Sequence, residues 1–406
     1  MNNTSIKLPS NNMKDNIIKL YLCAFFGNWA FATGILVFHY RELGFSFFQI
    51  FLITVVYEVL NFFLEIPTGV LADKWSCRKT IIIGYLISGI SFFVVLIKPE
   101  VYITYVVWSI LSAVCTTLNS GSVSAFTYNT VQEIDSNLYP KVLSKISAIS
   151  LITQAISIII GGILSDQIGF NVALLISGIG GIIQTIIFAT TIEPRNQGQT
   201  QKVEDRSISQ QFVDQVKSSF IILFKNQNVR FFLFYGILFF IISEFTGVIY
   251  QPYLGELGFS TKSIIAFFSA GSLLLIAASS FLCGHIKTRK NEVDLLLWIS
   301  AGLCLSLVML FIPKISIPAF VLLYLCIGAD GIVLFDIINR FIPTDNRATV
   351  LSAQNQLSSI SYSLFALLIG MSIDNLGMRL SSLLVGIILI LSFSLLFSRN
   401  RVREIM

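Results

Sequence analysis

Long apolar stretches with hardly a charge inside them recur twelve times along this chain, and they decide its fold class. Each is close to the roughly 20 residues that a helix needs to cross the hydrocarbon core of a bilayer. A soluble core has no room for so much uniformly apolar helix, whereas a bilayer requires it, because every backbone polar group must bond within its own segment. The stretches are Leu20–Phe38, Phe47–Leu64, Ile81–Ile97, Val101–Phe126, Val142–Leu164, Val172–Thr190, Phe231–Leu254, Ile264–Ile286, Leu295–Ile312, Ile317–Phe335, Leu357–Ile373 and Leu380–Phe397.

The composition agrees with a polytopic integral membrane protein. Hydrophobic residues make up 55% of the 406 residues and charged residues only 12%, against roughly one-quarter charged in a soluble domain. The six cysteines lie in or beside apolar runs or at the inner face. We therefore interpret each cysteine as a small buried hydrophobe rather than as half of a disulfide.

The lysines and arginines predict the orientation in the membrane. With the N-terminus in the cytoplasm, the inner segments hold 22 of these residues and the outer segments hold five. The positive-inside rule makes that the expected topology, with both termini cytoplasmic and the protein in the plasma membrane. The formal charge of +5 then reflects topology, and no nucleic-acid partner is expected.

Three short motifs occur twice, in the same order and at a nearly constant offset, each at a helix boundary. Two halves of six helices, related by this repeat, are the arrangement in which a substrate site forms near the bilayer midplane between halves that rock. The matches are Glu-Leu-Gly-Phe-Ser at 42–46 and 256–260, Val-Leu-Ser at 142–144 and 350–352, and Asp-x-x-Gly at 166–169 and 374–377.

The repeat divides the chain into two bundles and a linker. The longest polar stretch runs from Glu193 to Asn228 and lies between the halves. We expect an N-terminal six-helix bundle over 1–192, a cytoplasmic linker over 193–228 and a C-terminal six-helix bundle over 229–406. The predicted fold class is an all-α membrane protein with twelve transmembrane helices in two pseudo-symmetric bundles.

The loop between the second and third stretches carries a recognisable motif. Gly69-Val-Leu-Ala-Asp-Lys-Trp-Ser-Cys-Arg-Lys79 resembles the signature loop of the major facilitator superfamily, with Ser76 in place of a glycine and Cys77 in place of an arginine. Glu65-Ile-Pro-Thr-Gly69 and the later stretch from Asn339 to Ser352 resemble a bacterial, drug-efflux-like branch of that superfamily. The resemblance covers essentially the whole chain and implies the superfamily's twelve-helix fold.

The same resemblance implies a conformational latch built from Gly69, Asp73 and Arg78. Asp73 lies just past the inner end of the second helix, where a carboxylate can accept bonds from a helix N-terminus and pair with Arg78. Such a latch would hold the halves together while the transporter opens outward. The alternative is an ordinary basic loop that only obeys the topology rule.

Three acidic residues lie near the middle of predicted spans: Glu58, Glu244 and Asp330. A carboxyl group at that depth costs at least about 2.5 kcal/mol on insertion scales, so it normally faces a cavity or a partner. Asp330 also resembles an acidic position that some multidrug members of the family use for proton coupling. We predict all three as proton-coupling candidates. The alternative for each is a structural hydrogen bond to a hydroxyl group of a neighbouring helix.

Neutral polar and aromatic residues on the predicted interior faces are candidates for the substrate cavity. A cavity of amides and aromatics with one or two carboxylates suits amphipathic neutral or cationic compounds. Phosphorylated or dicarboxylate substrates would call for buried arginines, and none lies deep in a span. The candidates are Asn28, Asn119, Gln154, Phe240, Gln251, Asn355 and Tyr362.

These features predict a secondary active transporter that exports amphipathic small molecules in exchange for protons. The expected partners are a small-molecule substrate, protons and the lipid bilayer, and we expect a monomer. No phosphate-binding glycine–lysine loop is present, so neither an enzyme nor an ATP-driven pump is predicted. We expect no cofactor and no metal, because His39 and His285 lie on opposite membrane faces.

Two alternatives stay open at this point. Drug antiporters commonly carry an arginine midway along the fourth helix and Gly-Pro-x-x-Gly-Gly on the fifth. This chain has Thr117 at the first position and Ser157-Ile-Ile-Ile-Gly-Gly162 at the second. Proton-coupled uptake of a small solute is therefore the first alternative. The second is a membrane sensor or lipid-handling protein that transports nothing.

Overall fold

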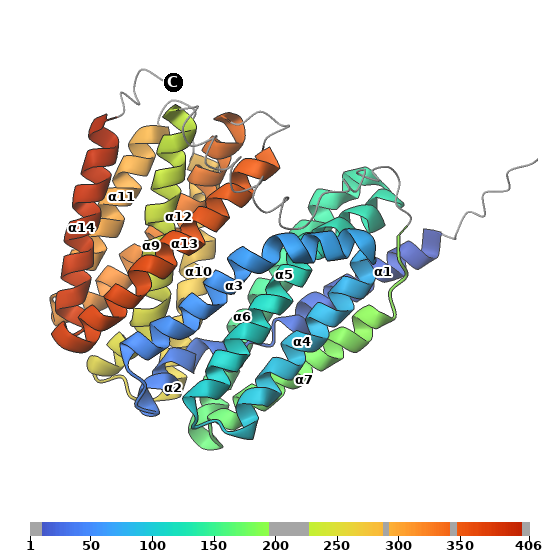
Figure 1. The fold of residues 1–406 in the computed structure, drawn as a ribbon, viewed down its shortest axis with the longest axis horizontal. Coiled ribbons are helices and arrows are strands. Elements are labelled where there is room, and N and C mark those ends of the chain that lie inside the picture. Colours follow the sequence, from blue (N-terminus) through green and yellow to red (C-terminus); the bar gives the residue numbers. More distant parts are fainter. Residues whose placement is uncertain (1–9, 195–226, 287–291, 342–346, 400–406) are drawn as a thin grey trace, which may run out of the picture. The chain divides into compact units, whose positions relative to one another are not determined.

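The computed structural model describes residues 10–194, 227–286, 292–341 and 347–399, and every regular element in these ranges is a helix (Figure 1). Ten of the described helices are long and apolar enough to cross a membrane. They are α3 (Phe47–Lys74), α4 (Cys77–Ile97), α5 (Tyr102–Gln132), α6 (Tyr139–Gln167), α7 (Phe170–Ala189), α9 (Gln227–Glu256), α10 (Lys262–Ile286), α12 (Ser316–Phe341), α13 (Arg347–Leu376) and α14 (Met378–Arg399).

The remaining helices account for the other two predicted spans. α11 (Glu292–Met309) is a shorter apolar helix that occupies the ninth stretch. α1 (Ser10–Gly27) and α2 (Leu36–Glu42) together occupy the first stretch. The predicted all-helical, twelve-span fold class is therefore confirmed. Three short 3-10 helices connect longer ones: η1 (Thr33–Ile35), η2 (Ser136–Leu138) and η3 (Pro313–Ile315).

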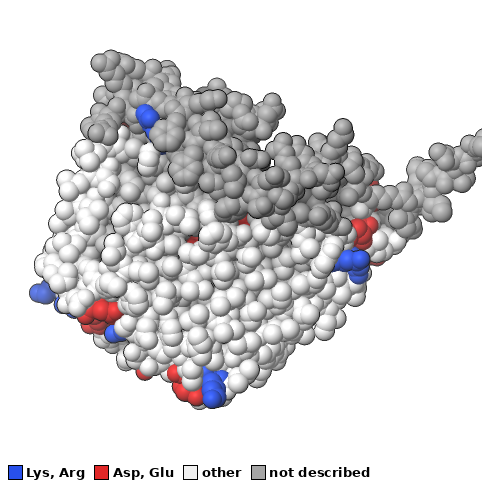
Figure 2. Space-filling model, in the orientation of Figure 1, with Lys and Arg blue, Asp and Glu red and all other residues white. Residues whose placement is uncertain are grey.

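The outer surface of the helices is apolar, as contact with lipid requires. Phe267, Trp298 and Leu364 are each more than three-fifths exposed. On the face drawn in Figure 2, the described charged side chains lie mainly near the edges, and the surface between them is almost uncharged. Because lipid is as apolar as a protein core, exposed leucine and phenylalanine carry no penalty on such a surface.

The described residues fall into two compact units. The first contains the described residues of Met1–Gly34 and Phe63–Ile208, and the second those of Ile35–Phe62 and Ser209–Met406. Residues 35–62, early in the sequence, thus pack with the helices of the C-terminal part of the chain. The predicted bundle boundaries at 192 and 229 describe the internal repeat and remain a proposal.

The repeated motifs fold into repeated turns. Gly44 and Gly258 follow α2 and α9 with φ of +81° and +96°, and Gly169 and Gly377 follow α6 and α13 with φ of +118° and +81°. These four are the positive-φ residues of the described chain. A left-handed residue just past a helix is the usual glycine C-cap, because glycine has no Cβ to clash.

The first two of these turns, at Gly44 and Gly258, also have the same pattern of hydrogen bonds. The amide of Phe45 donates to the carbonyl of Tyr40, and that of Phe259 donates to the carbonyl of Leu254, both at 3.1 Å. Each is the bond between residues five apart that defines a Schellman cap. The shared Glu-Leu-Gly-Phe-Ser sequence therefore encodes one helix end, used twice.

The first predicted span is not one helix. Its helix stops at Gly27, and regular structure resumes at Thr33, whereas we expected a continuous helix over Leu20–Phe38. The hydroxyl of Ser157, on α6, accepts from the amide of Ala30 and donates to the carbonyl of Asn28, each at 3.1 Å. An interrupted helix leaves backbone amides and carbonyls without hydrogen-bond partners, and Ser157 supplies two of these partners. Irregular backbone is tolerated at membrane depth only where such groups are satisfied.

Glycines on α6 and α7 make room for this break. A Cβ built on Gly161 would lie 1.9 Å from the carbonyl oxygen of Phe31, and one on Gly180 would lie 2.9 Å from the Cβ of Trp29. The broken segment therefore lies directly against the backbone of both helices. Small residues such as Gly161 permit this close approach between transmembrane segments.

Candidate functional site

Two of the three predicted acids lie in the second unit within electrostatic range of each other. Glu58 is 8% exposed, and its Oε2 accepts a hydrogen bond of 2.5 Å from the Ser359 hydroxyl of α13. Glu244, on α9, interacts electrostatically with Glu58. Two carboxyl groups from distant parts of the sequence thus influence each other near the junction of α3, α9 and α13, and we name them the Glu58–Glu244 pair.

An aromatic and hydroxyl wall adjoins this pair. Tyr362 is fully buried, its hydroxyl lies 2.9 Å from the hydroxyl of Thr54, and it interacts electrostatically with both glutamates. The ring of Phe240 packs edge-on against the ring of Tyr362, with centroids 6.0 Å apart. Predicted cavity residues Phe240 and Tyr362 therefore lie beside the predicted acids.

Asp330 occupies a different place. It is fully buried on α12, and its Oδ1 accepts a hydrogen bond of 2.5 Å from the hydroxyl of Tyr235 on α9. Its Oδ2 has no hydrogen-bond partner among the described residues. The Tyr235 ring packs against Phe393 of α14, with centroids 5.4 Å apart. One oxygen of this carboxyl group is thus satisfied, and the other is buried without a described partner.

The two acid sites lie on opposite sides of α9. Tyr235 and Glu244 are nine residues apart, which is about two and a half helical turns and a rise of about 13 Å. The extra half turn points the two side chains in opposite directions. The Glu58–Glu244 pair and Asp330 are therefore separate sites that share one helix.

Gln251 has a partner that the sequence did not suggest. Its side chain is 3% exposed, and its Oε1 accepts from the backbone amides of Val37 and Phe38, at 2.9 and 3.0 Å. Those amides belong to the first turn of α2, where the helix itself offers no acceptor. Gln251, predicted to line the cavity, therefore caps the second half of the broken first span.

Two further polar contacts, one a pair of hydrogen bonds and one an ion pair, connect residues 35–62 to the later helices. The Asp374 carboxylate, from α13, accepts from the amides of Phe47 and Phe48 at the start of α3, both at 2.8 Å. A carboxylate at a helix N-terminus is favoured by the exposed amides and the helix dipole. The Lys262 ammonium of α10 lies 2.9 Å from Glu42 Oε2.

His39 lies beside the Lys262–Glu42 contact. Its Nδ1 lies 3.2 Å from the Oε2 atom of Glu42. Burial lowers the pKa of His39, and the hydrogen bond to Glu42 acts in the opposite direction. His39 is therefore a polar neighbour of the Lys262–Glu42 ion pair at α2 rather than an isolated polar residue.

The predicted polar residues of the first unit have local partners. The Asn28 side-chain amide donates to the Ala24 carbonyl at 2.8 Å and to the Ser150 hydroxyl at 3.0 Å, so it bridges α1 and α6 at the break. Asn119 donates to Cys115 Sγ at 3.4 Å, and its side chain packs where a Cβ on Gly84 would stand.

For two predicted cavity residues, the described contacts do not place the side chain in a cluster. Gln154 is half-buried on α6 and Asn355 is exposed on α13. Within the described ranges, no three histidine, cysteine or acidic side chains come together as a metal site.

The predicted latch is described only in part. Asp73 falls within α3, but its side chain lies outside the described residues. The Arg78 guanidinium donates to the Ala189 carbonyl at the end of α7, and its amide donates to the Glu193 carboxylate at 3.3 Å. No described atom lies within 4 Å of a Cβ built on Gly69, so its described surroundings do not require glycine.

Several residues of these sites were missed by sequence reasoning. Thr54, Ser359 and Tyr235 are not among the predicted site residues, although each hydroxyl contacts one of them in the structure. Asp374 did carry a signal, because its Asp-x-x-Gly motif recurs. The motif marks the repeat, and in the structure its carboxylate also caps the N-terminus of α3.

Sequence comparison relates the chain to known transporters. The family model described as Major Facilitator Superfamily matches residues 20–366. The chain is 22% identical over 368 residues to the "uncharacterized MFS-type transporter YxaM" of Bacillus subtilis (strain 168), covering 86% of each chain.

Two solved structures show the same fold at low identity. A single-residue mutant of the nucleoside transporter NupG aligns with a TM-score of 0.74 and 14% identity, over 95% of this chain and 99% of that one. A bacterial homologue of the human lysosomal transporter Spinster, inward-facing and occupied, aligns with a TM-score of 0.71 and 15% identity, over 98% and 99%.

Proposed function

This chain belongs to the Major Facilitator Superfamily of transporters, and we propose that it exports amphipathic small molecules in exchange for protons by alternating access. The observation that carries the proposal is the Glu58–Glu244 pair, which lies beside the Phe240 and Tyr362 rings. Carboxyl groups inside a membrane are expensive unless they face water, a substrate or a partner group, and they commonly mark proton or substrate pathways.

The pair is suited to exchange a proton for a substrate. Two interacting carboxyl groups bind protons as a unit, so a change at one is felt by the other. Aromatic rings at the same place offer contact to an apolar or cationic compound. Glu244 and Asp330 are the leading proton carriers in this proposal, and Glu58 is the partner of Glu244.

A flux assay in inverted membrane vesicles tests direction and coupling together. Rhodamine 6G, an amphipathic fluorescent cation, is expected to accumulate inside vesicles whose lumen is acid and to leak out when a protonophore collapses the gradient. Vesicles without the protein are the control. Accumulation only in right-side-out vesicles would contradict export.

Uptake by symport is the second candidate, and one observation favours it. Thr117 stands where drug antiporters of the resembling branch carry an arginine, and its hydroxyl donates to the Ala113 carbonyl of its own helix at 3.0 Å. That position therefore has no positive charge that could interact with a substrate or with a proton-binding carboxylate. The vesicle assay separates the two directions.

The orientation in the plasma membrane is a further part of the proposal. We expect the termini and the 193–228 linker in the cytoplasm, because 22 of the 27 basic residues then lie inside. In intact cells, a membrane-impermeant maleimide should label Ser260→Cys and spare Thr200→Cys, each compared with the wild-type chain. Labelling of the second variant and not the first would reverse the topology.

The latch proposal predicts that removing the charge of Asp73 slows transport. Replacing Asp73 by Asn keeps the side-chain shape and removes the charge that the latch requires, so transport should fall at least about tenfold, as for the loss of an interaction worth about 1.4 kcal/mol. The amount of protein in the membrane should not change. Lys79→Gln, a charge change in the same loop, is the control, and normal flux in well-expressed Asp73→Asn would refute the latch.

A further inference from the structure

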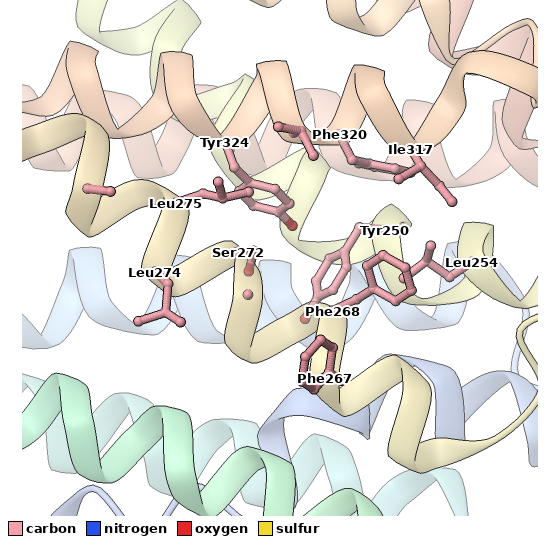
Figure 3. Close-up of a pocket in the computed structure, with 13 residues that line it drawn as sticks. Tyr250, Leu254, Phe267, Phe268, Ser272, Leu274, Leu275, Ile317, Phe320 and Tyr324 are labelled. Carbon is pink, nitrogen blue, oxygen red and sulfur yellow. The ribbon is translucent and has the colours of Figure 1, made fainter.

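An apolar cavity of about 450 Å³ lies among α9, α10 and α12 (Figure 3). Its size falls within the roughly 300–1,000 Å³ of typical small-molecule sites. None of the described residues that line it is charged. It belongs entirely to the second unit and includes neither the Glu58–Glu244 pair nor Asp330.

The wall of the cavity presents rings and alkyl groups, while its hydroxyl groups already have partners. Tyr250 donates to the Ser269 hydroxyl at 2.8 Å, and Ser272 donates to the Ser269 carbonyl at 2.8 Å. The rings of Tyr250 and Tyr324 meet edge to face, with centroids 5.9 Å apart. An occupant would therefore find apolar contact and no strong polar anchor.

The edge of the cavity lies on exposed helix surface. Phe267 and Leu274, both on α10, line it and are 67% and 63% exposed. A compound that partitions into a bilayer is concentrated beside such a surface. Burying an apolar group there gains roughly 25 cal/mol per Å².

One lining residue connects the cavity to the broken first span. The Tyr250 hydroxyl accepts a hydrogen bond of 3.0 Å from the side-chain amide of Gln251, whose Oε1 caps α2 at Val37 and Phe38. Gln251 thus contacts both the cavity wall and α2. A shift of the Tyr250 ring would move the acceptor that holds these two amides.

We propose that this cavity binds the uncharged, apolar part of the amphipathic compound that the protein transports, and that Tyr250 and Gln251 relay its occupancy to α2. The proposal rests on the transport function proposed above and names the part of the substrate recognised here. The absence of charge in the described wall selects an alkyl or aromatic moiety, and the charged end of the compound stays outside the cavity.

Filling the cavity tests the binding site. A Cβ on Gly271 meets no described atom within 4 Å, so Gly271→Leu can place its side chain in the cavity without displacing a helix. We expect it to weaken rhodamine 6G binding, measured by fluorescence anisotropy in nanodiscs, about tenfold or more, which corresponds to about 1.4 kcal/mol. Gly284→Leu is the matched control, because it lies on the same helix, is equally open and does not line the cavity.

The relay needs a separate readout. Rhodamine 6G should change the hydrogen-exchange rate of the amides in α2 in the wild type and in Gly284→Leu, but not in Gly271→Leu. Tyr250→Phe keeps the ring and removes the hydroxyl that Gln251 contacts. At dye concentrations that saturate each protein, Tyr250→Phe should therefore lose the exchange response that the wild type shows.

The outcomes separate this proposal from the proposed function. If the wild type transports rhodamine 6G and Gly271→Leu binds it equally well, the cavity proposal is overturned and export stands. If lipid mass spectrometry finds a phospholipid that is lost only in Gly271→Leu while dye binding is unchanged, the cavity is a lipid site and the proposal is also overturned. If the wild type binds neither rhodamine 6G nor Hoechst 33342, both proposals fail together.

Discussion

Replacing Glu244 by glutamine is expected to abolish uphill transport while leaving downhill exchange in place. The substitution keeps the size of the side chain but removes the group that takes up a proton. The accumulation ratio of rhodamine 6G in proteoliposomes should then fall to about one, since no free energy from the proton gradient reaches the substrate. Glu58→Gln should have the same effect, because the two carboxyl groups interact.

Asp330 provides the comparison within the same protein. It lies on the other side of α9 from the Glu58–Glu244 pair, and its described hydrogen bond is to Tyr235. If Asp330 carries a proton, Asp330→Asn should also stop substrate-driven proton release in proteoliposomes, whereas Tyr235→Phe should only alter its pH dependence. If Asp330 is structural, both variants should lower thermal stability and leave the proton release per substrate unchanged.

The three acids can be judged by one set of measurements. Substrate-driven proton release is recorded for the wild type, Glu244→Gln, Glu58→Gln and Asp330→Asn at equal protein content. If every variant concentrates the substrate against its gradient as well as the wild type does, none of these acids couples proton movement to transport. The hydrogen bonds to Ser359 and Tyr235 would then point to a structural role for Glu58 and Asp330.

The sequence predicted the number of spans and the acids, but not which acids influence each other. Glu58 and Glu244 are 186 residues apart, and the sequence identifies each only as an acid near the middle of its own predicted span. Their meeting depends on the rotation and depth of α3 relative to α9, which follow from side-chain packing along both helices. Hydropathy carries no information on either quantity.

The break in the first span escaped prediction for a related reason. Residues 28–32 read Asn-Trp-Ala-Phe-Ala, which is nearly as apolar as a helix interior and contains neither proline nor glycine. The backbone leaves the helix because Ser157 and Gly161 on α6 offer hydrogen bonds and room, so the cause lies about 130 residues away. The Gly-Gly pair on α6 was visible in the sequence, but its partner was not.

Gln251 shows how one side chain supports two interpretations. A glutamine on the interior face of a span suggested a cavity lining, whereas in the structure it accepts from the amides of Val37 and Phe38. The first turn of every helix has amides without acceptors. In a continuous first span, however, the amides of Val37 and Phe38 would lie inside the helix and would already be bonded. The interpretation failed because the break was not foreseen.

Gly161→Ala is expected to be strongly destabilising, because among the described glycines a Cβ at Gly161 would make the closest contact. Its Cβ would lie 1.9 Å from the Phe31 carbonyl oxygen and 2.5 Å from the carbonyl carbon, and these are backbone atoms that cannot rotate aside. Overpacking of this kind typically costs about 1–3 kcal/mol and sometimes more. The segment would have to move away from α6, which would also strain the bonds between Ser157 and residues 28 and 30.

For the matched control, Gly121→Ala, we expect no loss of stability. Gly121 lies in the interior of α5, and no described atom is within 4 Å of a Cβ built there. Because alanine is better than glycine in a helix by up to about 1 kcal/mol, Gly121→Ala should leave stability unchanged or raise it. Thermal unfolding in detergent, followed by tryptophan fluorescence, compares both with the wild type. Equal stability and flux in Gly161→Ala would mean that the first span does not approach α6 this closely, and the break would then need another cause.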